Sequence, residues 1–192
     1  MPRLTRAESQ ARTRDLLVAT ARGLFLRDGY HATSLEKVAD EAGFSKGAVY
    51  SNFRNKDELC LAVLDAIHAD ELTKALAEVG TANSFDEGIA GFQTWAERMI
   101  GDEGWTTLEV EFAIQARRDP KLRAELASRD KAIRDAISNV VASRADHLAM
   151  DPHDLATALL SLGIGLGMQR VIDPTIPVDV LVKTLRALTR VS

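Results

Sequence analysis

The stretch from Ser45 to Arg54 carries small and polar side chains where a buried helix would carry leucine. At 100° per residue, one side of a helix through this stretch would present Lys46, Gly47, Tyr50, Ser51 and Arg54. A cation and a phenol hydroxyl suit phosphates, a small hydroxyl suits a base edge, and a glycine permits close approach. The set favours a nucleic-acid contact, although an ordinary exposed helix can have this composition and the spacing alone leaves both interpretations open.

Side chains that could support catalysis or hold a metal are scattered along the chain. The four histidines are His31, His68, His147 and His153, and no His-Glu-x-x-His, nucleophile elbow or phosphate-binding loop occurs. The single cysteine, Cys60, excludes a disulfide framework within one chain and suits a reducing compartment. We therefore expect no enzyme activity, no metal site and no cofactor.

Nothing at the N-terminus has the pattern of an export signal, because the first fifteen residues are polar and charged throughout. The longest apolar runs are broken by Gly, Arg or Asp and fall below the ~20 residues of a membrane-spanning helix. These features predict a cytoplasmic protein that does not contact a membrane.

Helix signals surround the polar stretch. Apolar residues recur at helical spacing from about Glu8 to Arg27, and Gly29 can end that helix in a left-handed conformation. Thr33 and Glu36 have the spacing of a capping box, which predicts a second helix of about two turns.

Gly43 interrupts the second helix, and Ser45 can cap a third helix that ends near residue 53. Two short helices joined by a tight turn with a glycine form a helix-turn-helix, whose second helix enters the major groove of DNA. The segment 55–58 repeats the capping pattern and begins a long amphipathic helix that reaches about residue 78.

Taken together, "ATARGLFLRDGYHATSLEKVADEAGFSKGAVYSNFRNKDEL", residues 19–59, resembles the DNA-binding domain of TetR-family transcriptional regulators. The similarity rests on the Gly-Tyr after the first helix, the Thr before the second, and Tyr-x-x-Phe followed by Lys-x-x-Leu, and it covers about the first third of the chain. It implies DNA contacts at Thr33, Ser34, Ser45, Lys46, Gly47, Tyr50 and Ser51, with Lys56 as a phosphate contact.

Charge is distributed unevenly along the chain, whose net charge is −4. Residues 1–60 contain ten Lys and Arg against eight Asp and Glu, whereas residues 61–192 contain fourteen against twenty. The first fourteen residues hold four arginines and one acid, namely Arg3, Arg6, Arg12, Arg14 and Glu8. We therefore expect a basic N-terminal arm in which Arg3 and Arg6 reach a minor groove of DNA.

Beyond a loop at 80–84, further helices are expected at about 85–100, 103–118, 120–145, 152–170 and 177–190. Two of them open with Asp-Pro, in which Asp can cap and Pro can occupy the first helical position. No period-two alternation or hairpin turn indicates a strand. The sequence predicts an all-α fold of about nine helices, with a helix-turn-helix domain and basic arm at 1–55 and a second domain at 56–192.

The resemblance implies that the C-terminal helices bind an inducer and form a homodimer. Leucines and glycines four apart predict a dimer interface of Leu159, Leu162, Gly163, Leu166, Gly167, Leu181 and Leu185, with an internal core helix as the alternative. Aromatic and methionine side chains predict an effector pocket of Phe92, Trp95, Met99, Trp105, Phe112 and Gln115, with plain core as the alternative.

These features predict a homodimeric regulator of transcription that binds a palindromic operator in double-stranded DNA. The expected mode is a repressor that an unknown small-molecule effector releases. The alternatives are an activator, a regulator without an effector, or a helical ligand-binding protein that no longer uses DNA.

Overall fold

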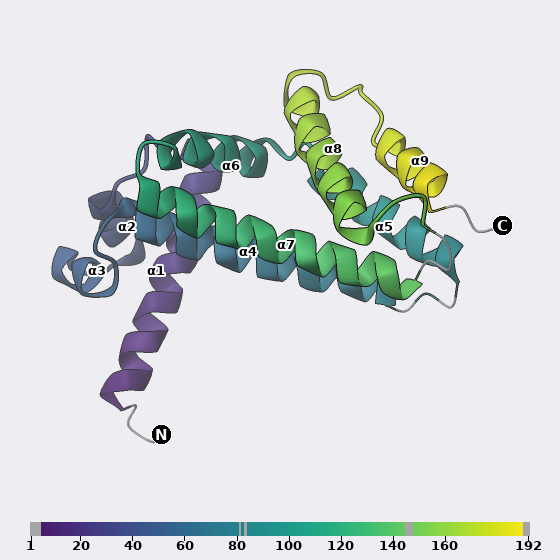
Figure 1. Ribbon diagram of the computed structural model, residues 1–192. Helices are drawn as coiled ribbons and strands as arrows, with labels where there is room; N and C mark the ends of the chain where they lie inside the picture. Colours follow the sequence, from purple (N-terminus) through teal and green to yellow (C-terminus); the bar gives the residue numbers. More distant parts are fainter. Residues whose placement is uncertain (1–4, 81, 83, 145–147, 190–192) are drawn as a thin grey trace.

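The computed structural model describes residues 5–80, 82, 84–144 and 148–189, and within them the chain is helical with no strand (Figure 1). In chain order the helices are α1 (Arg6–Asp28), α2 (Leu35–Ala42), α3 (Lys46–Asn52), α4 (Lys56–Gly80), α5 (Phe85–Met99), α6 (Glu103–Ala116), α7 (Pro120–Arg144), α8 (Pro152–Ile172) and α9 (Asp179–Leu188). The all-α prediction is confirmed, and the expected helices differ from these by a few residues at their ends. Residues 81 and 83 of the expected loop lie outside the described residues.

Side-chain caps begin most of these helices, because a hydroxyl or carboxylate accepts a hydrogen bond from an otherwise unpaired backbone N–H. Such caps are Ser34, Ser45, Ser84, Asp102 and Asp151. At α2 the cap is Ser34, which accepts from the Lys37 N–H, so the expected capping box at Thr33 is wrong by one residue. Gly43 ends α2 in a left-handed conformation with φ +70°, which positions the tight turn into α3.

The start of α1 also differs from expectation. Thr5 and Glu8 form a reciprocal capping box, so the helix begins at Arg6. Arg6 is therefore the first residue of a helix and not part of a flexible arm. Arg3, the other arginine expected to reach a minor groove, lies outside the described residues.

Two hydrophobic cores hold the helices together. The first core joins α1, α2 and α3 to the first half of α4 and to α6, and its buried members include Leu17, Phe25, Val49, Phe53, Leu59, Leu108 and Phe112. The first core contains residues on both sides of position 55. The predicted domain boundary between residues 55 and 56 therefore separates two expected roles, but the packing continues across it.

The second core lies at the other end of the molecule, between α5, α8 and α9 (Figure 1). Its buried members are Ala96, Leu155, Leu159, Leu166, Val178 and Leu181, with Phe92 and Trp95 packed against them. In Figure 1, α4 and α7 run across the molecule between the two ends, and the N-terminal turns of α1 project away from the body.

A close helix contact fixes α6 against α1. A Cβ atom placed on Gly104 would lie 2.5 Å from the carbonyl oxygen of Leu26, a distance that real Cβ atoms essentially never show. Backbone on backbone contact therefore sets the spacing of these helices, and only glycine permits it.

We expect Gly104→Ala to lower the free energy of unfolding by roughly 1–3 kcal/mol, because the added methyl group must push α6 away from α1. The measurement is chemical denaturation of the wild-type protein and the variant. Gly23→Ala in α1 is the matched control, because a Cβ there meets no atom within 4 Å and alanine raises helix propensity by ~1 kcal/mol. Equal effects of the two substitutions would contradict the close contact.

Candidate nucleic-acid interface

Helix α3 buries one side and leaves the other open. Val49 is fully buried and the following Phe53 is 1% exposed, so both anchor the helix in the first core. On the open side the exposed residues are Ser45, Lys46, Gly47, Tyr50 and Ser51. A Cβ on Gly47 would meet only the Ser45 hydroxyl, at 3.8 Å, so nothing within the chain requires glycine at this position.

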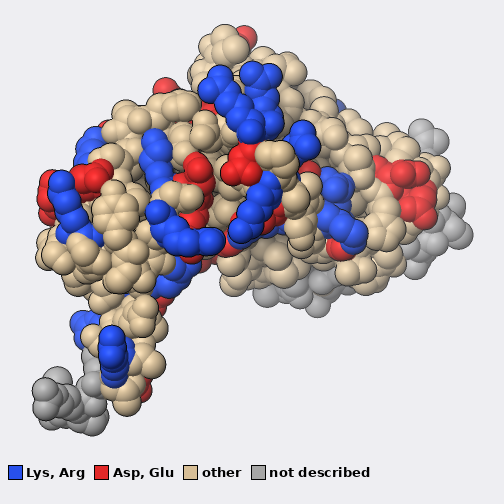
Figure 2. Space-filling model, turned by 60° about the vertical axis from the view of Figure 1, so that its left-hand side comes forward, with Lys and Arg blue, Asp and Glu red and all other residues tan. Residues whose placement is uncertain are grey.

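A depression of about 450 Å³ lies beside this open side. Its lining residues are His31, Thr33, Ser34, Leu35, Glu36, Tyr50, Arg54, Asn55 and Lys56, from the start of α2, from α3 and from the start of α4. The structure therefore brings together four of the expected contact residues, which are distant in sequence. Figure 2 shows Lys and Arg side chains spread over the molecular face that contains α2 and α3, with Asp and Glu among them.

Tyr50 is half exposed, and its hydroxyl donates a 2.9 Å hydrogen bond to the Glu36 carboxylate. That bond and the negative charge of Glu36 raise the pKa of Tyr50. A hydrogen bond from its own backbone N–H and the bond from Tyr50 lower the pKa of Glu36. The phenol is thus kept protonated as a donor, and a phosphate that binds it has to replace Glu36 as the acceptor.

Lys56 is partly buried beside the turn that follows α1. Its Nζ donates to the carbonyl oxygen of Tyr30 at 2.9 Å and lies 4.1 Å from the centre of the Tyr30 ring. Burial lowers the pKa of Lys56. Because an ammonium has three N–H donors, the bond to Tyr30 fixes the side chain without using all of them.

The hydroxyls of the serine and threonine residues mostly have partners inside the protein. Thr33 is 1% exposed and donates to the Gly29 carbonyl oxygen at 2.9 Å. Its side chain stabilises the turn, and its contact with DNA stays a prediction. Ser34 and Ser45 cap α2 and α3, and Ser51 donates to the Ala48 carbonyl oxygen at 2.9 Å, yet these three remain exposed at the surface.

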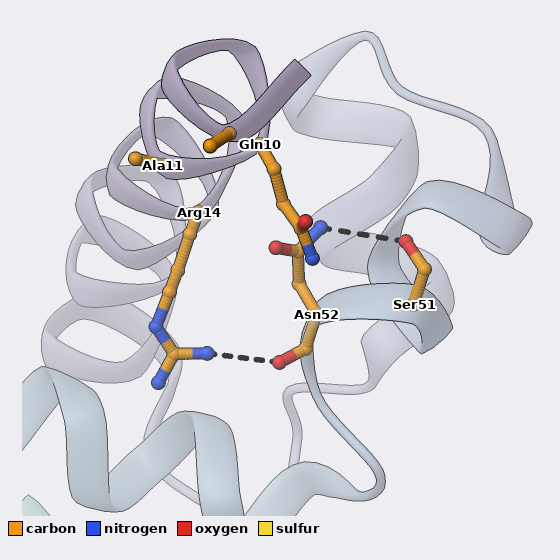
Figure 3. Close-up of a pocket in the computed structure, with 6 residues that line it drawn as sticks. Gln10, Ala11, Arg14, Ser51 and Asn52 are labelled. Atoms are coloured by element: carbon orange, nitrogen blue, oxygen red, sulfur yellow. Dashed lines mark hydrogen bonds between the residues drawn. The ribbon is translucent and has the colours of Figure 1, made fainter. Parts of the chain in front are cut away.

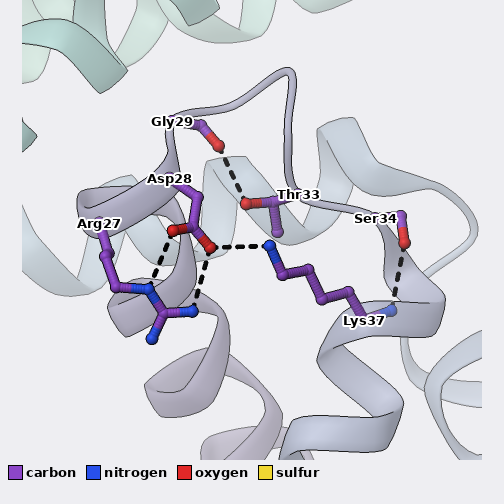
Figure 4. Close-up of polar contacts among 6 residues, drawn as sticks. All are labelled: Arg27, Asp28, Gly29, Thr33, Ser34 and Lys37. Carbon is purple, nitrogen blue, oxygen red and sulfur yellow. Dashed lines mark hydrogen bonds and ion pairs between the residues drawn. The ribbon is translucent and has the colours of Figure 1, made fainter.

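An ion-pair cluster ties the end of α1 to α2 (Figure 4). The Asp28 carboxylate accepts from Arg27 at 2.9 Å and 3.1 Å and from the Lys37 ammonium at 2.8 Å. The hydrogen bonds from Arg27 and then Lys37 lower the pKa of Asp28 to about 2. The cluster orients α2, whose N-terminus forms one wall of the depression.

Four lining residues of the depression were not among the side chains expected at the site: His31, Leu35, Glu36 and Asn55. Glu36 was assigned to a capping box, and its acceptor role toward Tyr50 depends on how α2 packs beside α3. Helical spacing placed Arg54 on the open side of α3, and its side chain lines the depression. Among the described residues no group of three or more His, Cys, Asp or Glu side chains could hold a metal, and His147 lies outside them.

The residues expected to form one effector pocket divide between the two cores. Phe92 and Trp95 stack with their ring centres 5.6 Å apart and pack against the second core, and Met99 and Gln115 are half-buried. Trp105 and Phe112 instead belong to the first core, where Phe112 packs on Tyr30. The six side chains are therefore divided between two packing clusters, and their assignment to one effector pocket stays a prediction.

The expected dimer residues of α8 and α9 mostly face inward. Leu159, Leu166 and Leu181 are buried in the second core, Leu162 and Leu185 pack against it, and Gly167 lies beside Thr106 and Gly101. Gly163 lies beside Ile100, which follows the last residue of α5. The glycines thus allow close contact within the chain, which favours the alternative of an internal core helix, and a dimer interface at these residues stays a prediction.

The opposite face of α8 is also apolar and is exposed. Ile164 is 49% exposed, Met168 38% and Ile172 83%, and Val180 of α9 is 41% exposed. Helix α8 is long and apolar enough to cross a membrane by length and composition only, a test that core helices also pass. An exposed apolar face of this kind also suits a helix that packs on a second protein surface.

Comparison with protein families gives two matches along the chain. Residues 17–63 match the model of bacterial regulatory proteins of the tetR family. Residues 81–191 match the model of a tetracyclin repressor-like C-terminal domain, which covers more than half of the chain.

Individual relatives agree with these matches. The chain is 27% identical over 134 residues to the HTH-type transcriptional repressor AcnR of Corynebacterium efficiens, covering 70% of this chain and 66% of that repressor. It is 28% identical over 171 residues to the nicotine-responsive transcriptional repressor HdnoR of Paenarthrobacter nicotinovorans, covering 85% and 86%. The match therefore spans slightly less than two thirds of AcnR and most of HdnoR.

The fold recurs in solved structures. A putative transcriptional regulator from Rhodococcus sp. RHA1 superposes with a TM-score of 0.76 at 18% identity, covering 91% of this chain and 94% of that one. At this identity the likeness extends to the fold alone.

Asp28 gives a test of how α2 is held. Its folded-state pKa lies below the unfolded value of about 3.8, so its contribution to stability is present above about pH 4 and is lost as the pH falls toward 2. We expect Asp28→Asn to lower the thermal unfolding temperature at pH 7. The difference from wild type should narrow below about pH 4, and Asp15→Asn, on an exposed part of α1, is the control. A difference that stays constant with pH would contradict this role.

Proposed function

The chain belongs to the TetR family of bacterial regulatory proteins, and on that premise we propose that it is a homodimeric transcriptional repressor that binds a palindromic DNA operator. The observation that carries the proposal is the open side of α3, which is small and polar and adjoins a depression lined with hydrogen-bond donors. Such a helix suits a major groove only ~12 Å wide.

The proposed DNA contacts come from the three elements that meet at α3. Lys46 and Tyr50 supply donors for phosphates, Gly47 permits close approach of the backbone, and Lys56 adds a cation at the start of α4. The remaining contacts are the exposed Ser34, Ser45 and Ser51. Because α3 has few long side chains that can read bases, DNA shape is expected to contribute much of the specificity.

The proposed dimer forms through the exposed apolar face of α8 and α9, defined by Ile164, Met168, Ile172 and Val180. A two-fold axis through this face buries the same patch of both protomers. It also pairs two α3 helices, which have to lie about 34–36 Å apart to enter successive major grooves.

An effector site is proposed among the helices at the second core. The Trp95 indole N–H is buried there without a hydrogen-bond partner among the described residues, and one buried oxygen of Glu71 in α4 lacks a hydrogen bond but lies 4.0 Å from the Arg98 guanidinium. Glu71 is 6% exposed, and its other oxygen accepts from Lys74 at 2.5 Å. Since an unpaired buried polar group costs free energy, a ligand that accepts a hydrogen bond from Trp95 would gain affinity.

Coupling between effector and DNA is proposed to run through α4, which extends from the depression at Lys56 to the helices of the second core. A ligand shifts such an equilibrium only by its differential affinity for the two states. A displaced α4 would move Lys56 together with the Tyr30 turn. We further propose that the chain has no enzyme activity and acts in the cytoplasm, away from membranes, as suits a regulator of transcription.

The test of DNA binding is selection from a random duplex pool, which should enrich one palindrome. On that palindrome, Lys46→Ala with Tyr50→Phe should weaken binding at least about tenfold, because hydrogen bonds to charged groups are worth roughly 1.5–3 kcal/mol. Lys131→Ala on the exposed side of α7 is the control and should bind as wild type does. Unchanged affinity of the double variant would show that Lys46 and Tyr50 do not contact DNA. Equally weak binding of the wild-type protein to all sequences would refute the proposal of a sequence-specific regulator.

The dimer face is tested by Ile164→Glu, measured by analytical ultracentrifugation. An unpaired charge in a buried interface costs several kcal/mol, so the dissociation constant of the dimer should rise at least about 100-fold. Ile114→Glu is the matched control, because Ile114 is 52% exposed on α6, away from α8. Equal behaviour of the two variants would place the dimer interface elsewhere.

A further inference from the structure

The first two turns of α1 extend beyond the helices that surround α3 (Figure 1). Residues 5–12 are all exposed, and the first buried residue of the helix is Leu17. The reciprocal cap between Thr5 and Glu8 nevertheless holds this segment helical up to Arg6. A capped helix that packs on nothing offers a rigid surface to a partner.

The charges of this segment are sorted by helix face. Arg6, Gln10 and Arg14 are spaced four apart and continue the face on which Leu17 and Ala21 are buried. At 100° per residue the acids Glu8 and Asp15 fall on the opposite face. The side of α1 that is turned toward α3 is therefore cationic and polar.

A second depression, of about 300 Å³, lies between this face and the end of α3 (Figure 3). Its lining residues are Ala7, Gln10, Ala11, Arg14, Ser51 and Asn52. Arg14 donates to the Asn52 carbonyl oxygen at 2.8 Å and its guanidinium lies 4.2 Å from the centre of the Phe53 ring. These contacts fix the angle between α1 and α3, and Figure 3 shows Gln10 directed toward Asn52 across the gap.

Gln10 lies one turn before Arg14 and Arg6 two turns before it, on the same face. In the described part of the chain neither side chain has a hydrogen-bond or ion-pair partner. Arg14, in contrast, contacts both the Asn52 carbonyl oxygen and the Phe53 ring. The inward face of α1 thus changes from apolar to polar where α3 ends. A duplex that lies along the open side of α3 would pass this polar face.

The two depressions lie on opposite sides of α3. One adjoins the start of α2 and α4 with Ser34, Tyr50 and Lys56, and the other adjoins α1 with Gln10 and Arg14. A helix in the major groove has the phosphate backbone of one strand on each side. We propose that Arg6 and Gln10 contact the phosphates of the strand on the α1 side, opposite the strand held by Tyr50 and Lys56.

This inference rests on the proposed function, because it concerns the same DNA complex. Phosphate contacts on both strands fix the orientation and depth of a recognition helix without reading bases themselves. For an α3 with few base-reading side chains, such a two-sided hold would set the register in which Lys46, Tyr50 and Ser51 meet the groove.

The experiment compares Arg6→Gln with Arg12→Gln on the selected palindrome. Arg12 is an exposed arginine of the same two turns that lies away from the α3-facing side, so it is the matched control. We expect Arg6→Gln to weaken binding roughly 3- to 10-fold and to reduce the slope of log affinity against log salt by about one per protomer. Arg12→Gln should keep the wild-type slope. Circular dichroism should show the wild-type helix content for both variants, because neither substitution changes the cap formed by Thr5 and Glu8.

Phosphate ethylation interference supplies the second readout. In the wild-type complex, ethylation should interfere on both strands that flank α3, and Arg6→Gln should lose the interference on one strand only. The inference would be overturned if the salt slope of log affinity were equal for Arg6→Gln, Arg12→Gln and wild type and the interference pattern were unchanged. That result would not contradict the proposed repressor function. A wild-type protein that selects no palindrome would instead overturn the proposed function, and this inference with it.

Discussion

The turn at Tyr30 is the junction on which the placement of the DNA-facing helices depends. Its backbone N–H donates to Glu111 of α6 at 2.7 Å, its carbonyl oxygen accepts from Lys56 of α4, and its hydroxyl donates to Asp57. Burial and then the bond to Asp57 raise the pKa of this phenol, so it remains a donor at any physiological pH. One residue thus joins α1, α4 and α6, and a movement of α6 cannot leave Lys56 unaffected.

The packing of α6 on α1 reinforces this junction. Gly104 brings the backbone of α6 onto Leu26, two residues before α1 ends, and Glu111 occupies the space beside Gly29. The first core accordingly includes side chains of α6 together with those of the helix-turn-helix. In the proposed repressor, a ligand that displaces α6 or α4 would act on a rigid contact and would not depend on a flexible linker.

Helix α8 shows how a periodic pattern can establish a helix without establishing which face it buries. Leucines and glycines spaced four apart predicted an outward dimer face, whereas within this chain Leu159 and Leu166 are buried in the second core and Gly167 lies beside Thr106. Because α8 is apolar on all sides, the spacing does not distinguish its inner face from its outer face. The exposed Ile164 and Met168 are visible only once α5 and α9 are in place.

The sequence by itself determined the helices, several of their caps and the helix-turn-helix, because these depend on contacts within a few residues. Ser45, Gly43 and the Asp-Pro starts of α7 and α8 act through their own backbone neighbours. Tertiary structure alone decided which side chains remain available for a ligand. The Tyr50 hydroxyl donates to Glu36 and Phe112 packs on Tyr30, and both contacts join segments that only folding brings together.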